Sequence, residues 1–179
     1  PDNKDLLLVK LKVMYDQKRT SDVIAVLRRL HEVDPATPSY VIDLANELAA
    51  DNRLDDAEAV YKEALAANQG SDELMAAFAG FLVAKKSVNQ AIDEIKTLTD
   101  QSKKAPKYML LLEQLYLKAG KLDPAAALMT DLQTNGAAES DRLRAQVELA
   151  RITLLRGDKP AALDQLNTVI TQDSSNAEA

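Results

Sequence analysis

The sequence repeats a pattern of small and apolar residues at intervals of 34 residues. The stretch NRLDDAEAVYKEAL at residues 52–65 returns 68 residues later as GKLDPAAALMTDLQ at residues 120–133. One small position recurs along the whole chain, at Val23, Ala57, Ala91, Ala125 and Ala162. The last of these is displaced by three extra residues. A fixed period of this length predicts that one small structural unit is repeated, and that each copy buries its apolar face against its neighbours.

Each copy predicts two amphipathic helices. A large apolar residue follows the small residue after four positions, and a further apolar residue follows after three more, which places both on one helix face. In chain order these pairs are Leu27 and Leu30, Tyr61 and Ala64, Ile95 and Leu98, Met129 and Leu132, and Leu166 and Val169. A second apolar stripe precedes each of these helices. Hydrophobic residues make up 46% of the chain and aromatic residues 4%, a composition that favours helices over strands, so we expect an all-α fold.

Polar residues predict where the helices begin. Residue types that cap the first backbone N–H groups of a helix stand two residues before the small position, at Ser21, Asp55, Asn89 and Asp123. Pro124 follows the last of them, as expected at the start of a helix. Caps for first helices are predicted at Thr37 and Ser71. His31 is the one histidine, and a structural role at a helix end is predicted for it.

The turns inside the pairs call for residues that tolerate positive φ. Asn52, Gly120 and Gly157 suit this position, whereas Lys18 and Lys86 occupy it less favourably. The three-residue displacement before the fifth copy has two interpretations. Either Ser140 caps a first helix that is longer by nearly one turn, or residues 134–140 form a longer loop.

The units resemble the tetratricopeptide repeat (TPR) family, whose repeat is a 34-residue helix-turn-helix. The resemblance covers one solenoid fragment over residues 1–179, with repeats at residues 4–37, 38–71, 72–105, 106–139 and 143–176. The array is similar to divergent bacterial ones: Trp is missing, and Lys10 and Glu113 stand where the family is usually apolar or small. The resemblance implies a right-handed α-solenoid of about five repeats. The residues at either end are interpreted as parts of further repeats, which predicts a longer array.

Composition excludes several classes of function. A net charge of −6 and a pI near 4.9 argue against a nucleic-acid partner. No apolar run is long enough to predict a membrane span. The chain has no cysteine and one histidine, and it lacks a glycine-rich phosphate loop, so no catalytic, cofactor or metal site is predicted. Charge is uneven along the sequence, which indicates either a solvated surface or the steering of a charged partner.

The resemblance implies a partner-binding surface on the concave side, formed by the first helix of each pair. The predicted residues are Leu8, Lys12, Tyr15, Ile42, Asn46, Gly80, Val83, Leu110, Gln114, Leu117, Val147, Arg151 and Leu154. Two small residues in the same rows, Ala49 and Ala76, have the alternative of only packing between helices. This largely apolar surface with a polar line suits an amphipathic helix or an extended segment. Family members that clamp a C-terminal carboxylate use a lysine where this chain is apolar, so that subtype is not expected.

We therefore expect a non-catalytic scaffold that binds a protein or peptide partner within an assembly. The array looks most similar to those of bacterial envelope and exopolysaccharide-secretion lipoproteins, which favours the periplasm or envelope over the cytoplasm. The alternatives are a docking or regulatory arm of a larger enzyme, and a self-association module. A homo-oligomer through the two ends is a further possibility, because Leu163, Leu166, Val169 and Ile170 have no following helix in this sequence.

Overall fold

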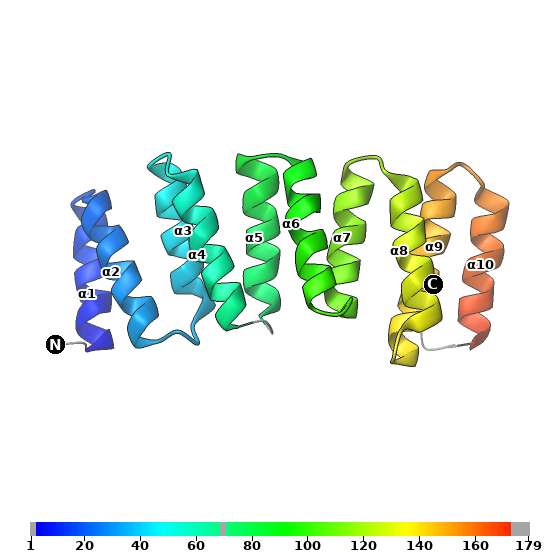
Figure 1. The fold of residues 1–179 in the computed structure, drawn as a ribbon, viewed down its shortest axis with the longest axis horizontal. Coiled ribbons are helices and arrows are strands. Elements are labelled where there is room, and N and C mark those ends of the chain that lie inside the picture. The colour runs from blue at the N-terminus through cyan, green and yellow to red at the C-terminus, as the bar shows by residue number, and fades with distance from the viewer. Residues whose placement is uncertain (1–2, 69–70, 173–179) are drawn as a thin grey trace. The chain divides into compact units, whose positions relative to one another are not determined.

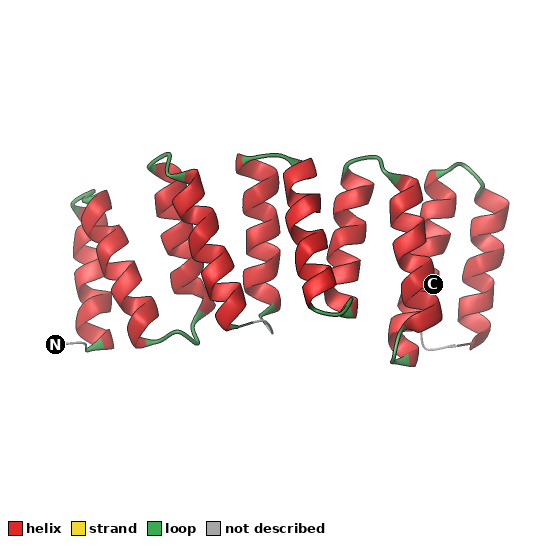
Figure 2. Cartoon of the chain, viewed as in Figure 1, coloured by secondary structure: helices red, strands yellow, loops and turns green. Residues whose placement is uncertain are grey.

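The computed structural model describes residues 3–68 and 71–172, which form ten α-helices and no strand (Figures 1 and 2). In chain order the helices are α1 (Lys4–Asp16), α2 (Thr20–Val33), α3 (Pro38–Ala50), α4 (Leu54–Ala67), α5 (Asp72–Lys85), α6 (Val88–Gln101), α7 (Pro106–Lys118), α8 (Leu122–Asn135), α9 (Glu139–Leu155) and α10 (Lys159–Gln172). The all-α prediction is confirmed. In the first four pairs the first helix begins at residues 4, 38, 72 and 106, so the period of the sequence is also the period of the helices.

The chain divides into two compact units. Residues 1–87 form the first unit, which contains α1 to α5, and residues 88–179 form the second, which contains α6 to α10. Within the first unit each helix contacts the next one along the chain, and α3 also contacts α5. Within the second unit each helix likewise contacts its neighbour in the sequence. Helix pairs are therefore stacked on one another inside each unit.

The small residues of the repeat lie where helices approach closely. Ala57 and Ala91 are fully buried, and the large residue that follows Ala57 by four positions, Tyr61, is 1% exposed. In the first unit the ring of Tyr61 lies 5.4 Å from that of Phe78 and 5.6 Å from that of Phe81, so α4 and α5 share an aromatic core. In the second unit a buried cluster joins α7, α8 and α9 through Met109, Ala125, Met129, Leu132, Ala145 and Ile152.

The predicted turns are correct at four positions and wrong at the fifth. Asn52, Gly120 and Gly157 have φ values of 60°, 69° and 93°, and Lys18 accepts a φ of 55° despite its side chain. Lys86, by contrast, has a φ of −121°. The connection after α5 therefore takes a different path, in which the N–H of Lys86 still bonds to the carbonyl of Leu82.

The predicted caps of the second helices are wrong by two residues. The N–H of Val23 bonds to the carbonyl of Arg19, and that of Ala57 to the carbonyl of Arg53, both at 3.0 Å. These helices therefore begin at Thr20 and Leu54, with Arg19 and Arg53 as their N-cap residues. The four predicted caps, Ser21, Asp55, Asn89 and Asp123, and Pro124 after them, lie inside the first turn.

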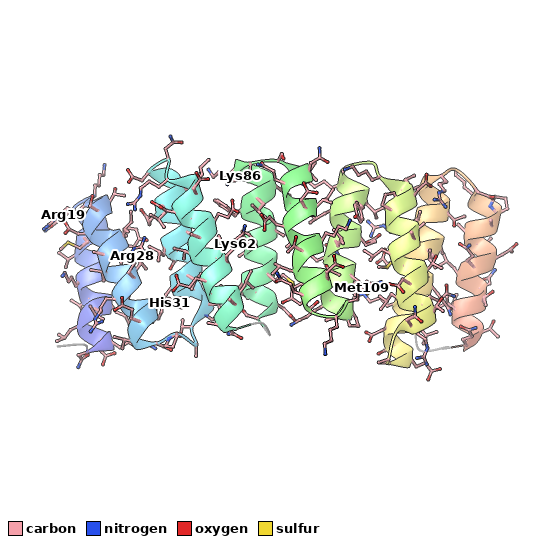
Figure 3. The ribbon with its side chains drawn as sticks, viewed as in Figure 1. Arg19, Arg28, His31, Lys62, Lys86 and Met109 are labelled. Atoms are coloured by element: carbon pink, nitrogen blue, oxygen red, sulfur yellow. The ribbon has the colours of Figure 1, made fainter. Side chains whose placement is uncertain are left out.

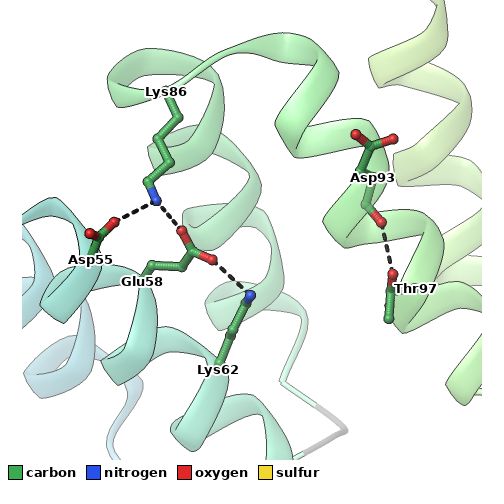
Figure 4. Close-up of polar contacts among 6 residues, drawn as sticks. All are labelled: Asp55, Glu58, Lys62, Lys86, Asp93 and Thr97. Atoms are coloured by element: carbon green, nitrogen blue, oxygen red, sulfur yellow. Dashed lines mark hydrogen bonds and ion pairs between the residues drawn. The ribbon is translucent and has the colours of Figure 1, made fainter.

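Three of those four side chains bind the next helix pair instead. Asp55 accepts a hydrogen bond from Nζ of Lys86 at 3.0 Å, and Asn89 accepts one from Nζ of Lys121 at 2.8 Å. Asp123 accepts one from Arg156 at 2.5 Å. Figure 4 shows the first of these contacts, where Lys86 also pairs with Glu58 of α4, and Figure 3 places Lys86 at the end of α5. Residues with the chemistry of caps thus connect consecutive pairs.

The first helices confirm one cap and correct two. Ser71 precedes α5 and its Oγ accepts the N–H of Leu74 at 3.2 Å, as predicted. Thr37 precedes α3, but its hydroxyl donates to Asp34 at 2.8 Å rather than capping the backbone. The ninth helix has 17 residues, so the longer first helix is confirmed and the longer loop is wrong. Ser140 does not cap it, because the helix already begins at Glu139.

Candidate partner-binding surface

In the first unit, most residues predicted for partner binding are accessible on α1, α3 and α5. Leu8 and Tyr15 on α1 are 38% and 41% exposed. The others are exposed, as are Lys12, Asn46 and Gly80, or half-buried, as are Ile42 and Val83. Of the two small residues with an alternative role, Ala49 is buried and packs between helices, whereas Ala76 is exposed. The surface of this unit is apolar with polar residues between its apolar members.

Tyr15 shows that α1 and α3 lie side by side on this surface. Its phenol hydrogen-bonds the side chain of Glu47 on α3. Burial, together with the carboxylates of Glu47 and Asp43, raises the pKa of Tyr15 to about 12, so the phenol stays protonated and donates. Burial and the charge of Glu47 also raise the pKa of Asp43. The first unit therefore presents apolar groups beside two carboxylates.

In the second unit, five of the six predicted residues are accessible on α7 and α9. Leu110 and Leu117 are half-buried and Gln114 is exposed on α7. Arg151 is exposed on α9, where Leu154 is 48% exposed. Val147 is the exception, because its side chain is buried on α9 at 9% exposed. We therefore leave Val147 out of the surface.

Glu113 lies beneath the surface of the second unit. Its side chain is 1% exposed, and its Oε1 has no hydrogen-bond partner among the described residues. Burial and, to a smaller extent, the carboxylate of Glu148 on α9 raise the pKa of Glu113, and Arg151 lowers it, so that together they bring the pKa to about 7. Arg151 lies 3.5 Å from Glu148. These interactions place α7 beside α9, as Tyr15 places α1 beside α3.

A buried carboxylate at this position was not predicted, although the sequence carried its signal. Glu113 stands at the repeat position of Ala45 and Ala79, which are 0% and 3% exposed. A glutamate at a position reserved for small buried residues has to leave its carboxyl group between helices. The repeat alignment could therefore have identified Glu113 as a buried acid.

No helix in the described ranges, 3–68 and 71–172, combines the length and apolar character that a membrane crossing requires.

The tetratricopeptide repeat family matches residues 48–115 of the chain. None of the curated proteins compared with the chain matches its sequence. Solved structures with the same fold include YrrB, described as a TPR protein with an unusual peptide-binding site, at 12% identity and a TM-score of 0.53 over 99% of this chain and 90% of that one. A thermophilic TPR protein of Thermus thermophilus is 17% identical, with a TM-score of 0.55 over 97% of this chain and 93% of that one.

A tetratricopeptide repeat protein from Parabacteroides merdae is 16% identical, with a TM-score of 0.55 over 97% of this chain and 68% of that one. At such identities the similarity shows the fold alone. The predicted fold class, an α-solenoid of helix-turn-helix repeats, is confirmed by these structures.

Proposed function

We propose that this chain, which matches the tetratricopeptide repeat family over residues 48–115, is a non-catalytic scaffold whose first helices bind a segment of a partner protein. Proteins built from this repeat are typically scaffolds that bind protein or peptide partners. One similar structure, YrrB, is described as having a peptide-binding site. The proposal assigns the same class of ligand to this chain.

The observation that carries the proposal is the row of apolar side chains that the first helices leave partly uncovered. Leu8 is accessible on α1 and Ile42 on α3, and in the second unit Leu110 and Leu117 on α7 are followed by Leu154 on α9. Each row has polar residues beside it. A row of apolar side chains can give affinity for a helical or extended peptide segment, and the polar residues beside that row can set the register of the segment.

The charges on the first unit specify the segment further. Asp43 and Glu47 lie beside Tyr15 on its surface, and residues 32–75 as a whole carry many more acids than bases. A partner segment with apolar anchors and a basic residue would pair with these carboxylates. The predicted setting in a bacterial envelope or exopolysaccharide-secretion assembly stays a prediction.

The test uses the chain to capture a partner from its native source, followed by identification of that partner by mass spectrometry. Changing Leu110→Glu and Leu117→Glu together places two charges in the apolar row of α7. We expect this double variant to lose at least about 90% of the captured partner, because burying an unpaired carboxylate costs several kcal/mol. Circular dichroism is expected to show unchanged helicity.

A matched control variant adds the same two negative charges to α8, which is the second helix of its pair. Thr130→Glu with Thr134→Glu adds two carboxylates to the exposed side of α8 and is expected to capture the partner as the unaltered chain does. If both double variants capture the partner equally well, the first helices of the second unit do not form the binding surface.

A further inference from the structure

The second unit contains a cavity that is separate from the surface on its first helices. The cavity has a volume of about 480 Å³ and is lined by α6, α7 and α8, together with Lys104 from the connection between α6 and α7. Its base is apolar, with Leu112 buried and Tyr116 and Leu128 half-buried. Ligand pockets typically have volumes of about 300–1,000 Å³ and apolar walls with a few polar groups. This cavity has both properties.

The repeat places a second cavity at the equivalent position one unit later. This smaller cavity, of about 230 Å³, is lined by α8, α9 and α10. Gln133 stands there at the repeat position of Lys96 in the larger cavity, 37 residues earlier. Thr168 likewise stands at the repeat position of Asp131. The residues that line the smaller cavity are uncharged, so charge distinguishes the larger one.

Basic residues predominate along one edge of the larger cavity. Residues 96–107 contain four lysines and a single acid, Asp100, in a chain whose net charge is −6. Lys96 is exposed and has no ion-pair partner among the described residues. Lys104 pairs with Asp131 of α8 at 2.7 Å, but its side chain is 57% exposed. Because an exposed ion pair contributes little, a carboxylate from a ligand can replace Asp131 as the partner of Lys104.

A strained turn holds Lys104 at this edge. Lys103 and Lys104 have φ values of 55° and 58°, in the left-handed region that residues with a side chain rarely adopt. The N–H of Lys103 bonds to the carbonyl of Asp100 at 3.1 Å. The N–H of Lys104 bonds to the carbonyl of Thr99 at 2.8 Å. Backbone strain of this kind is concentrated at functional sites, and here it fixes the lysine that borders the cavity.

We propose that this cavity binds an acidic segment of a partner protein through one large apolar side chain of that segment. The apolar side chain packs on Leu112, Tyr116 and Leu128 at the base. Carboxylates on either side of it pair with the ammonium groups of Lys96 and Lys104. The charge of residues 96–107 favours an acidic segment over a neutral or basic one. Because the first helices use other residues, this inference does not depend on the proposed function.

Fluorescence anisotropy with capped acidic peptides tests the inference on the whole chain. The peptides consist of glutamate and aspartate around one central residue, which is phenylalanine, leucine or alanine. The tighter of the first two is expected to bind at least about tenfold more tightly than the alanine peptide, because alanine leaves the apolar base uncovered. Raising the salt concentration from about 0.05 M to about 0.5 M is expected to weaken binding, since the lysines are exposed.

Two variants locate the site. Ala127→Phe places a ring in the cavity from an exposed position on α8 and is expected to weaken peptide binding at least about tenfold, because the anchor then has less apolar surface to cover. Ala59→Phe, exposed at the same repeat position on α4, is its control and is expected to bind as the unaltered chain does. Lys96→Glu reverses a charge at the cavity and is expected to weaken binding far more than Lys118→Glu, its control at an exposed position on α7.

The inference is overturned if none of the peptides binds, or if the alanine peptide binds as tightly as the other two. A single-stranded oligonucleotide of the same charge that binds as tightly as the peptides would also overturn it, because the lysines would then attract any polyanion. Equal peptide affinity of Lys96→Glu and Lys118→Glu would place binding elsewhere. Circular dichroism checks the helicity of each variant, and Lys96→Glu tests the site through an exposed side chain, without any change to the packing of α8.

Discussion

Glu113 is the residue whose environment differs most from what its side chain prefers. Its carboxyl group is buried between α7 and α9, has one oxygen without a hydrogen-bond partner in the described structure, and faces the acid Glu148 and the base Arg151. Ionisation there leaves a charge without adequate solvation. The protein is therefore expected to hold Glu113 protonated over part of the range in which a free glutamate is ionised.

This environment predicts how stability depends on pH. The pKa of Glu113 is about 7 in the folded chain and close to 4.5 in the unfolded chain, so between these values the folded state binds more protons. Its contribution to the free energy of unfolding is therefore complete below about pH 4.5 and declines as pH rises to about 7, by at most about 3 kcal/mol. Denaturant unfolding at a series of pH values measures the decline.

Glu113→Gln removes the ionisable group and keeps the shape of the side chain. The difference in unfolding free energy between this variant and the unaltered chain is expected to change between pH 4.5 and 7 and to be constant above that range. Glu139→Gln, at an exposed position in the first turn of α9, is the control for the loss of a carboxylate from the surface. A difference that is independent of pH for Glu113→Gln would show that this carboxyl group titrates normally.

At the scale of the elements, the connections inside and between helix pairs decide where each helix begins. Lys18 joins α1 to α2 with a φ of 55°, a conformation that costs a residue with a side chain about 1 kcal/mol. Lys86 holds the same repeat position with a negative φ and instead binds Asp55 and Glu58 of the preceding helix. The same repeat position thus forms a turn with positive φ in the first helix pair, at Lys18, and an ion-pair link to α4 in the third, at Lys86.

Lys18→Gly is expected to raise the free energy of unfolding, by up to about 1 kcal/mol, because glycine adopts positive φ without the steric cost. Lys12→Gly, in the interior of α1, is the matched change and is expected to lower the same quantity by about 1 kcal/mol. Urea unfolding of the two variants measures both. Equal destabilisation by both changes would contradict the left-handed conformation at Lys18.

Lys86→Met is expected to destabilise the first unit by about 1 kcal/mol. The side chains of Lys86 and Glu58 are 17% and 16% exposed, so their ion pair is shielded more than a surface pair. Lys85→Met, at the exposed neighbouring position, is expected to leave thermal unfolding unchanged. If both variants melt at the same temperature as the unaltered chain, the link from α5 to α4 contributes nothing measurable.

At the scale of the whole molecule, the sequence predicted the features that follow from the 34-residue period. It did not predict the features that depend on contacts between helix pairs. The small position at Ala57 and Ala91 and the large one at Tyr61 identified the buried faces, because burial follows directly from helical spacing. The caps at Asp55 and Asp123 were wrong, because those carboxylates bind cations of the next pair and no local pattern specifies such partners.

For the candidate surface too, the sequence predicted the positions that follow from the repeat and missed those that depend on contacts between helix pairs. The positions on first helices followed from the repeat, and Leu110 and Leu154 are accessible as expected. Val147, at the equivalent repeat position on α9, is buried instead. Glu113 was noticed as unusual, but its environment depends on Glu148 and Arg151, which are more than 30 residues away in the sequence.

The most direct test of the central claim, that first helices bind the partner, is methyl NMR spectroscopy of the chain with and without the partner captured from its native source. We expect the methyl signals of Leu110, Leu117 and Leu154 to shift on binding, while those of Ile24 and Ile92 on second helices stay in place. Shifts confined to second helices, with Leu110 and Leu117 unmoved, would contradict the account.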